Sequence, residues 1–293
     1  MNEKIILGEI NTLLIKRDTD HGFFLVPSRT KEEICEQSET EAYEVLLPNA
    51  YITDDMQVGD EIEVFIYTDS EDRLVATTDY PKALINEFAF VKVVDVAPFG
   101  AFVDIGLPKH LLVPNNKQKN KFHVGDTRII RVVKDDKSER LIGIEKITSF
   151  LSSDTKHFKK NQEVKVLVIS KTPLGFKVIV DNNYEGMIYA NEVFCKLFTG
   201  DTKKAYIKTI REDGKLDISL QPIGKNAKKD AGSEKILELL QKNNGSLPFT
   251  YKSDADEIIK VFNISKKVFK SSLTLLIEAN KISLDEFGIQ LIK

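Results

Sequence analysis

The sequence predicts a mainly β protein, in which three small five-stranded barrels in tandem precede a small α+β C-terminal domain. Three observations support this prediction. The chain aligns with itself in three similar cassettes, each cassette alternates apolar and polar residues between turn signals, and the hydrophobic period changes after residue 224 and is helical from residue 233. With 293 residues, 42% apolar and 30% charged, the chain is long enough for several soluble domains.

Each cassette contains the same four parts in the same order. An apolar strand around a glycine comes first, at residues 19–26, 97–106 and 172–180, and a second short apolar run follows it. A Gly-Asp turn then opens another strand, and a charged turn leads into the last strand. About five short strands in roughly 60 to 75 residues are typical of the OB-fold, a small barrel whose exposed face commonly binds oligonucleotides.

The repeats set the predicted domain boundaries. We expect the three barrels over residues 1–80, 81–150 and 151–224. The polar segment 225–232 is interpreted as a linker, and residues 233–293 as the terminal domain.

The terminal domain is predicted to contain three helices and a hairpin. The first helix begins at the N-cap residue Ser233, the second follows Ser253, and the third begins at Ser265. The last apolar segment can close as a hairpin around Phe287-Gly288. Three helices and a hairpin in this order indicate a winged helix.

The charge is divided unevenly along the chain. Residues 1–80 contain 6 basic and 19 acidic residues, a net charge of −13, whereas residues 81–293 contain 36 basic and 26 acidic residues, a net charge of +10. Such asymmetry points to a polyanionic partner for the basic part. The first copy carries an acidic insertion within residues 30–44, so we expect this repeat to be a spacer, a protein-contact module or an electrostatic gate. We also expect residues 82–293 to fold without it, because each barrel would enclose its own core.

The second cassette reads FGAFVDIG at residues 99–106 and later enters a strand through Gly125-Asp126. This pattern resembles the S1 domain, an RNA-binding OB-fold, and the third cassette is recognisable by the same pattern. Three S1-like repeats before a winged helix that contains SKKVFK resemble the conserved virulence factor B family of bacterial RNA-binding regulators. The resemblance implies three tandem S1-like OB-fold barrels, a C-terminal winged helix and virulence-type regulation.

The S1 pattern implies a ligand face in the second repeat that contains Phe99, Phe102 and Arg140, with Pro114 at the position of the usual histidine. Strand alternation independently places Phe102 on the face opposite to Val103, which is the outer face if Val103 is buried. An outward ring can stack on an unpaired base, pack against a neighbouring repeat or contact a protein. These three interpretations remain open at this point.

The corresponding positions of the third repeat imply a more cationic site. The candidate residues are Lys177, Tyr189, Arg211 and Lys215. The three cations can bind phosphate or be solvated surface charges, and Tyr189 can stack on a base or belong to the barrel core.

The third predicted helix of the terminal domain has an apolar stripe and an opposite face that carries lysines. The candidate nucleic-acid contacts are Lys266, Lys267 and Lys270. They can contact RNA phosphates, enter the major groove of DNA or form a solvated face. The predicted wing turn contains Asp285 and Glu286 and no arginine, which argues against a minor-groove wing contact.

The sequence contains no recognisable catalytic pattern. Its four histidines are dispersed, and neither a P-loop nor an HExxH motif occurs, so we expect no enzyme, no cofactor and no metal. Cys35 and Cys195 lack CxxC spacing and are interpreted as buried or incidental thiols. No run of 18 apolar residues and no leader occurs, so we expect a cytoplasmic protein with no membrane contact.

The leading interpretation is a regulator that binds single-stranded RNA and acts after transcription. One alternative is a DNA-binding transcription regulator that uses the winged helix, although DNA ranks behind RNA as a partner. The other is an adaptor that docks to the ribosome or to RNA-degradation machinery.

Overall fold

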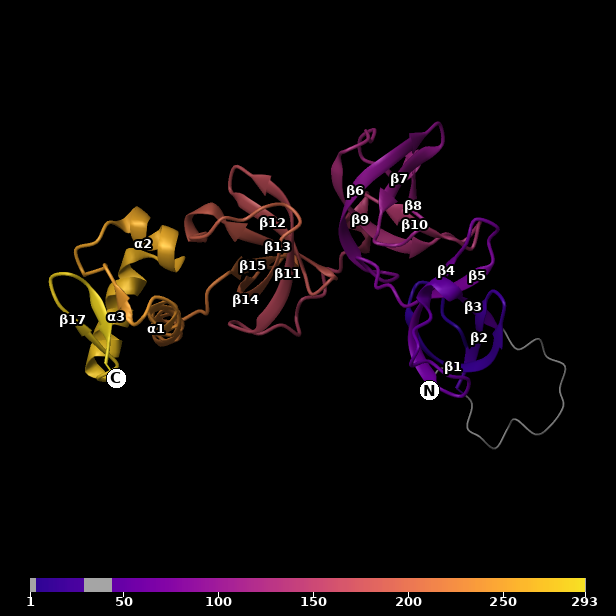
Figure 1. The fold of residues 1–293 in the computed structure, drawn as a ribbon. Coiled ribbons are helices and arrows are strands. Elements are labelled where there is room, and N and C mark those ends of the chain that lie inside the picture. Colours follow the sequence, from indigo (N-terminus) through magenta and orange to yellow (C-terminus); the bar gives the residue numbers. More distant parts are fainter. Residues whose placement is uncertain (1–3, 29–43, 293) are drawn as a thin grey trace. The chain divides into compact units, whose positions relative to one another are not determined.

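The computed structural model describes residues 4–28 and 44–292 (Figure 1). Cys35 and nearly all of the acidic insertion expected within residues 30–44 lie outside the described residues. The chain divides into two compact units, Met1–Ser149 with two barrels and Phe150–Lys293 with the third barrel and the terminal domain. The predicted fold class is confirmed: a mainly β chain with a small winged-helix domain at its C-terminal end.

The first barrel is a closed five-stranded barrel in the order β1-β2-β3-β5-β4. Its strands are β1 (Ile10–Thr19), β2 (Gly22–Pro27), β3 (Val45–Pro48), β4 (Glu61–Thr68) and β5 (Leu74–Thr77). Neighbouring strands are antiparallel except β3 and β5, which pair in parallel through Leu46 and Val75 and close the barrel. Alternate residues such as Leu13 and Ile15 fill the interior, as a strand period of two requires.

The second barrel is a five-stranded sheet in the order β10-β9-β6-β7-β8, so β8 and β10 are its edges. Its strands are β6 (Phe88–Ala97), β7 (Gly100–Asp104), β8 (Leu111–Pro114), β9 (Thr127–Lys134) and β10 (Leu141–Ile144). Gly100 begins β7 where a Cβ atom would lie 2.7 Å from the Val113 carbonyl oxygen, so a larger residue would push the two strands apart.

The first two barrels share hydrophobic packing, which contradicts the expectation that each barrel encloses its own core. Strand β4 directs Val64 and Ile66 into the first barrel, whereas Phe65, only 1% exposed, packs on the opposite face within the core of the second barrel. The backbone of Gly8 adds to the junction, because its N–H donates to Ile66 O and its carbonyl accepts from Ile85 N, each at 2.8 Å. The physical reason is that β4 is apolar on both faces.

The third barrel is closed in the order β11-β12-β13-β15-β14. Its strands are β11 (Glu163–Thr172), β12 (Gly175–Val180), β13 (Tyr184–Tyr189), β14 (Thr202–Ile210) and β15 (Leu216–Ser219). Its core lies within the second unit and includes Val166, Val178 and Ile207. A 3-10 turn follows the third strand of every barrel, at Asn49–Tyr51, Asn115–Lys117 and Ala190–Glu192, and another spans Ile147–Phe150.

The Gly-Asp turns have the same structural role in all three barrels. The three glycines, Gly59, Gly125 and Gly200, have φ values of 102°, 91° and 94°, which non-glycine residues rarely adopt. Each following aspartate accepts a hydrogen bond from the backbone N–H three residues before it, at 2.8 to 3.0 Å. The motif is therefore a capped turn that starts the fourth strand of each barrel.

The terminal domain contains three helices and a three-stranded sheet in the order β16-β18-β17. Its elements are α1 (Lys225–Lys242), β16 (Ser246–Leu247), α2 (Ala255–Phe262), α3 (Lys266–Glu278), β17 (Ile282–Leu284) and β18 (Ile289–Leu291). Phe262 and Phe269 meet in its core with ring centroids 4.8 Å apart. Among the residues that the structure describes, no helix has the length and apolar character needed to cross a membrane.

The segment 225–232 is helical, so its interpretation as a linker is wrong. It forms the start of α1, and Ser233, expected as the N-cap, lies inside the helix, where its hydroxyl donates to Lys229 O at 2.8 Å. A Cβ atom at Gly232 would lie 2.3 Å from Ser272 Oγ, so this glycine lets α1 approach α3 closely. The lysines and alanines of the segment also favour a helix.

The other two helix starts are fixed by side-chain caps. Ser265 caps α3 as expected, because its hydroxyl accepts from Val268 N at 3.3 Å. The second helix is capped by Asp254, which accepts from Asp256 N at 2.7 Å, rather than by the adjacent Ser253.

Candidate nucleic-acid interface

The second barrel presents a pair of aromatic rings on its outer surface. Phe99 occupies the turn between β6 and β7, and Phe102 lies on β7 between the buried residues Ala101 and Val103. The two rings meet edge to face with centroids 6.1 Å apart, and Phe99 is 60% exposed. An exposed aromatic pair of this kind offers flat apolar surface to a ligand.

The predicted residues of this repeat surround one cavity. Phe99, Phe102 and Arg140 line a space of about 320 Å³, together with residues of the edge strands β8 and β10. Lys109, which no sequence motif predicted, also lines it. This lysine belongs to the irregular loop before β8, where no strand or helix period indicates the direction of a side chain.

The two cations beside the cavity contact the turn between β4 and β5 of the first barrel. Arg140 forms an ion pair with Asp72, and Lys109 Nζ donates to the backbone carbonyl oxygen of Asp69. Burial lowers the pKa of Lys109, while the Arg140 side chain remains 53% exposed. Arg140 is thus accessible to a phosphate that displaces Asp72.

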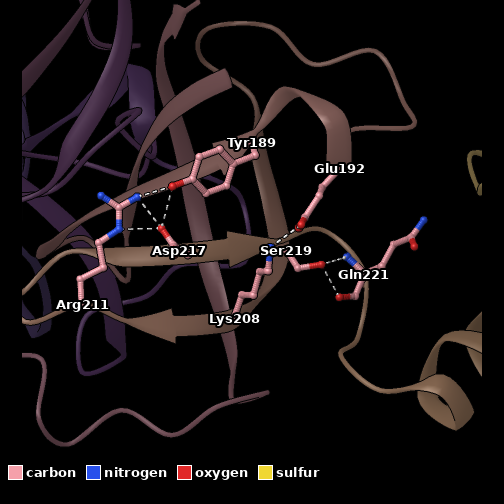
Figure 2. A network of polar contacts seen from close by, with 7 residues as sticks. All are labelled: Tyr189, Glu192, Lys208, Arg211, Asp217, Ser219 and Gln221. Carbon is pink, nitrogen blue, oxygen red and sulfur yellow. Dashed lines mark hydrogen bonds and ion pairs between the residues drawn. The ribbon is translucent and has the colours of Figure 1, made fainter. Parts of the chain in front are cut away.

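In the third barrel, Tyr189 and Arg211 are brought together by Asp217, as Figure 2 shows. Arg211 Nε donates to Asp217 Oδ1 at 2.7 Å, and the guanidinium also donates to the Tyr189 hydroxyl at 2.7 Å. The Asp217 carboxylate raises the pKa of Arg211. Lys208, itself ion-paired with Glu192, lies 5.7 Å from the centre of the Tyr189 ring. Tyr189 therefore belongs to a polar surface network rather than to the barrel core.

The other two predicted cations of the third barrel share a different carboxylate. Glu185 Oε1 lies 4.0 Å from Lys177 Nζ and 3.5 Å from Lys215 Nζ. The charge of each predicted cation in this barrel is thus partly balanced by Asp217 or Glu185, neither of which was among the predicted site residues. Asp217 had a recognisable signal, because it alternates with the apolar residues Leu216 and Ile218 on β15.

The terminal domain places its predicted lysines on α3. Lys267 and Lys270 are exposed and Lys266 is partly buried, while Phe269 and Leu273 are buried on the other side of the helix. At the tip of the wing, Asp285 Oδ1 accepts from the backbone N–H groups of Phe287 and Gly288, and the Phe287 ring is 78% exposed. The helix surface is therefore cationic, and the wing tip is apolar and acidic.

Three family models match successive parts of the chain. An S1 domain model matches residues 7–79, an S1 RNA binding domain model matches residues 86–146, and a CvfB-like winged helix domain model matches residues 234–291. The second match contains Phe99, Phe102, Lys109 and Arg140, the residues around the cavity of the second barrel.

The similarity to known proteins extends over most of the chain. An uncharacterized protein, YitL of Bacillus subtilis, is 30% identical over 288 residues, which cover 94% of this chain and 90% of that protein. A protein of Staphylococcus saprophyticus named conserved virulence factor B is 28% identical over 252 residues, 80% of this chain and 83% of that one. A solved multidomain protein with nucleic acid binding domains from Streptococcus pneumoniae is 28% identical, covers 98% of both chains and has a TM-score of 0.39.

The site and the sequence comparisons support the same assignment. S1 domains in the first two barrels, a CvfB-like winged helix and an exposed aromatic face with adjacent cations characterise a nucleic-acid-binding regulatory protein. Because its winged helix matches the CvfB-like model and its similarity to YitL and to conserved virulence factor B extends over most of its length, the chain belongs to the conserved virulence factor B family.

Proposed function

We propose that this protein binds single-stranded RNA through the second barrel and regulates gene expression after transcription, in the cytoplasm and without catalysis. The observation that supports this most strongly is the exposed Phe99–Phe102 ring pair beside Arg140 and Lys109. These residues lie within the part of the chain that matches the S1 RNA binding domain.

The arrangement suits an unpaired strand better than a duplex. A base that is free of a partner can stack on an aromatic ring, which contributes about 1 to 3 kcal/mol per base with little dependence on sequence. Arginine and lysine beside the rings can bind the phosphates of the same strand. In a duplex the bases are already stacked on one another, so the rings would gain little contact.

The regulatory part of the proposal rests on the family. Relatives are named conserved virulence factor B, which supports virulence-type regulation. A protein without catalysis can act on a message by occupying a single-stranded segment and changing the access of other factors to it.

Competition binding tests the proposed ligand. A labelled 15-nucleotide RNA would be displaced by unlabelled single-stranded RNA, single-stranded DNA and duplex DNA of matched sequence, at low and high salt. We expect single-stranded RNA to compete best, and Phe99→Ala to weaken RNA binding by about 1 to 3 kcal/mol. Phe198→Ala is the matched control, because Phe198 is 63% exposed on the third barrel and should change affinity by less than about 0.5 kcal/mol. Tighter binding of duplex DNA, or equal effects of the two substitutions, would contradict the proposal.

A DNA-binding regulator is the second candidate, favoured by the exposed Lys267 and Lys270 on α3. If these lysines instead contact RNA phosphates, replacing both with Ala should reduce the slope of log K against log salt concentration for RNA binding by about 1 to 1.5. A loss of duplex DNA binding with unchanged RNA binding would favour the DNA candidate.

A further inference from the structure

The cavity beside the aromatic pair is formed by two barrels rather than one. Phe99 and Phe102 come from the second barrel, whereas Tyr67 and Thr68 come from β4 of the first. Tyr67 follows the same face of β4 as Phe65, and the two rings are stacked with centroids 6.5 Å apart. Because Phe65 is held in the core of the second barrel, Tyr67 has a fixed position beside the cavity.

The size and lining of this cavity suit one flat aromatic group. Its volume of about 320 Å³ is at the lower end of the roughly 300 to 1,000 Å³ typical of small-molecule sites. Tyr67, Phe99 and Phe102 supply three rings, and leucine and isoleucine side chains from β8 and β10 supply further apolar surface. Burial raises the pKa of Tyr67 to about 12, in keeping with a ring packed at the junction of the two barrels.

The first barrel also positions the cations at the edge of the cavity. Its acidic turn, residues 69–73, is held by Asp69 Oδ1, which accepts from the backbone N–H groups of Glu71 and Arg73 at 2.9 and 3.0 Å. This ordered turn directs the Asp69 carbonyl toward Lys109 and the Asp72 carboxylate toward Arg140. Asp72 therefore pairs with the guanidinium of Arg140, which would otherwise be available to a phosphate.

We infer that this cavity is a pocket for one unstacked nucleobase of an RNA strand, built jointly by the first two barrels, in which Tyr67 forms a wall and Asp72 competes with the phosphate for Arg140. The inference rests on the proposed function and adds to it a direct role for the acidic first barrel. A single base fits the three rings, and the adjacent cations suit the negative charge of its backbone. The first barrel is thus part of the binding site, and its carboxylate sets how readily Arg140 is released.

The proposed role of Tyr67 as a wall of the pocket is tested by measuring the affinity of the protein for a uridine decamer. With the full chain, Tyr67→Leu should weaken binding roughly 5- to 100-fold, and Tyr67→Phe, which keeps the ring, should stay within about two-fold. Tyr80→Leu is the matched control, because Tyr80 lies outside the cavity and is 66% exposed. A single 4-thiouridine in the decamer should crosslink under ultraviolet light to peptides that contain Tyr67 as well as to peptides that contain Phe99 or Phe102.

The competition for Arg140 has a test of the opposite sign, which a misfolded variant could not imitate. Asp72 has a φ of 66°, a conformation that asparagine tolerates, so Asp72→Asn should fold and should strengthen decamer binding about two- to five-fold at low salt. Glu71→Gln removes the same charge from the same turn, but Glu71 pairs with Arg73 at 3.2 Å, so it should have a smaller effect. Equal gains from the two variants would overturn the competition at Arg140.

The outcomes separate this inference from the proposed function. If Phe99→Ala weakens binding while Tyr67→Leu leaves it unchanged and no crosslink reaches β4, the pocket inference is wrong and RNA binding by the second barrel stands. If neither substitution changes binding, both the pocket inference and RNA binding by the second barrel are wrong.

Discussion

The second and third barrels have a glycine at the same place in their second strand, and opposite residues pair in the same register. Gly100 pairs with Pro114 in the second barrel, and Gly175 pairs with Tyr189 in the third. The residues just before these glycines are both exposed, but one is Phe99 and the other is Leu174. Two residues after them, Phe102 corresponds to Lys177. One backbone therefore supports an aromatic face in one barrel and a charged face in the other.

The two faces also differ in what balances their cations. In the second barrel, Arg140 pairs with Asp72 of a different barrel, whereas in the third barrel Arg211 pairs with Asp217 of its own. The cations of the third barrel are thus partly balanced by carboxylates of their own barrel, whereas Arg140 of the second barrel depends on a carboxylate of the first. The comparison teaches that residue type at an S1 position does not define a site until the carboxylates around it are known.

The largest expected effect tests the dependence of the second barrel on the first. Phe65→Ala removes a ring that is 1% exposed from the core shared by the two barrels, and should lower the free energy of unfolding by about 3 to 5 kcal/mol. Differential scanning calorimetry should show that the first unit is destabilised while the second unit melts as before. Phe176→Ala, in the core of the third barrel, is the reciprocal control and should destabilise the second unit. Unchanged melting of the second barrel in Phe65→Ala would mean that the barrels are independent.

The second largest effect, on RNA affinity, is expected when the outer face of the second barrel receives the residues of the third barrel. The double variant Phe99→Leu, Phe102→Lys gives the second barrel the residues of the third, and should weaken single-stranded RNA binding by about 2 to 4 kcal/mol because both stacking rings are lost. Fluorescence anisotropy measures the affinity, and circular dichroism checks the fold. Retained affinity would show that the rings are not the binding surface.

The reverse exchange should give a smaller gain. Leu174→Phe with Lys177→Phe places two rings on the third barrel, where the native side chains are exposed, and should strengthen RNA binding by about 1 to 2 kcal/mol. The slope of log K against log salt concentration should also decrease by about 0.7, because one lysine is lost. If affinity does not rise, Lys208 and Glu192 beside Tyr189 would be the first residues to replace.

The smallest expected effect concerns the carboxylate of the third face. Glu185→Gln removes the charge near Lys177 and Lys215, and should strengthen RNA binding by about 0.2 to 1 kcal/mol at low salt, the range of exposed ion pairs. Glu163→Gln is the control, because Glu163 pairs with Lys204 at 2.7 Å, which is not one of the predicted site residues. Equal changes in the two variants would indicate a general charge effect, and a high-salt measurement should abolish either change.

Several features of this protein could be predicted from the sequence because they depend on neighbours along the chain. Strand alternation placed Phe102 outward, since successive side chains of a strand point to opposite faces. The Gly-Asp turns marked the start of the fourth strand of each barrel, because the turn requires a positive φ that glycine adopts without steric cost. The helical period from residue 233 likewise predicted the winged helix.

Other features were decided by tertiary contacts, which join residues far apart in the sequence. Gly232 of α1 lies close to Ser272 of α3, and no local pattern predicts that approach. The apolar run 64–67 on β4 was a signal for burial on both faces, but it did not say what Phe65 would pack against. The ion pair between Arg140 and Asp72 spans 68 positions, so only the docking of the first barrel on the second could create it. Local geometry thus determined which side chains point outward, and packing between distant strands determined which of them form a site.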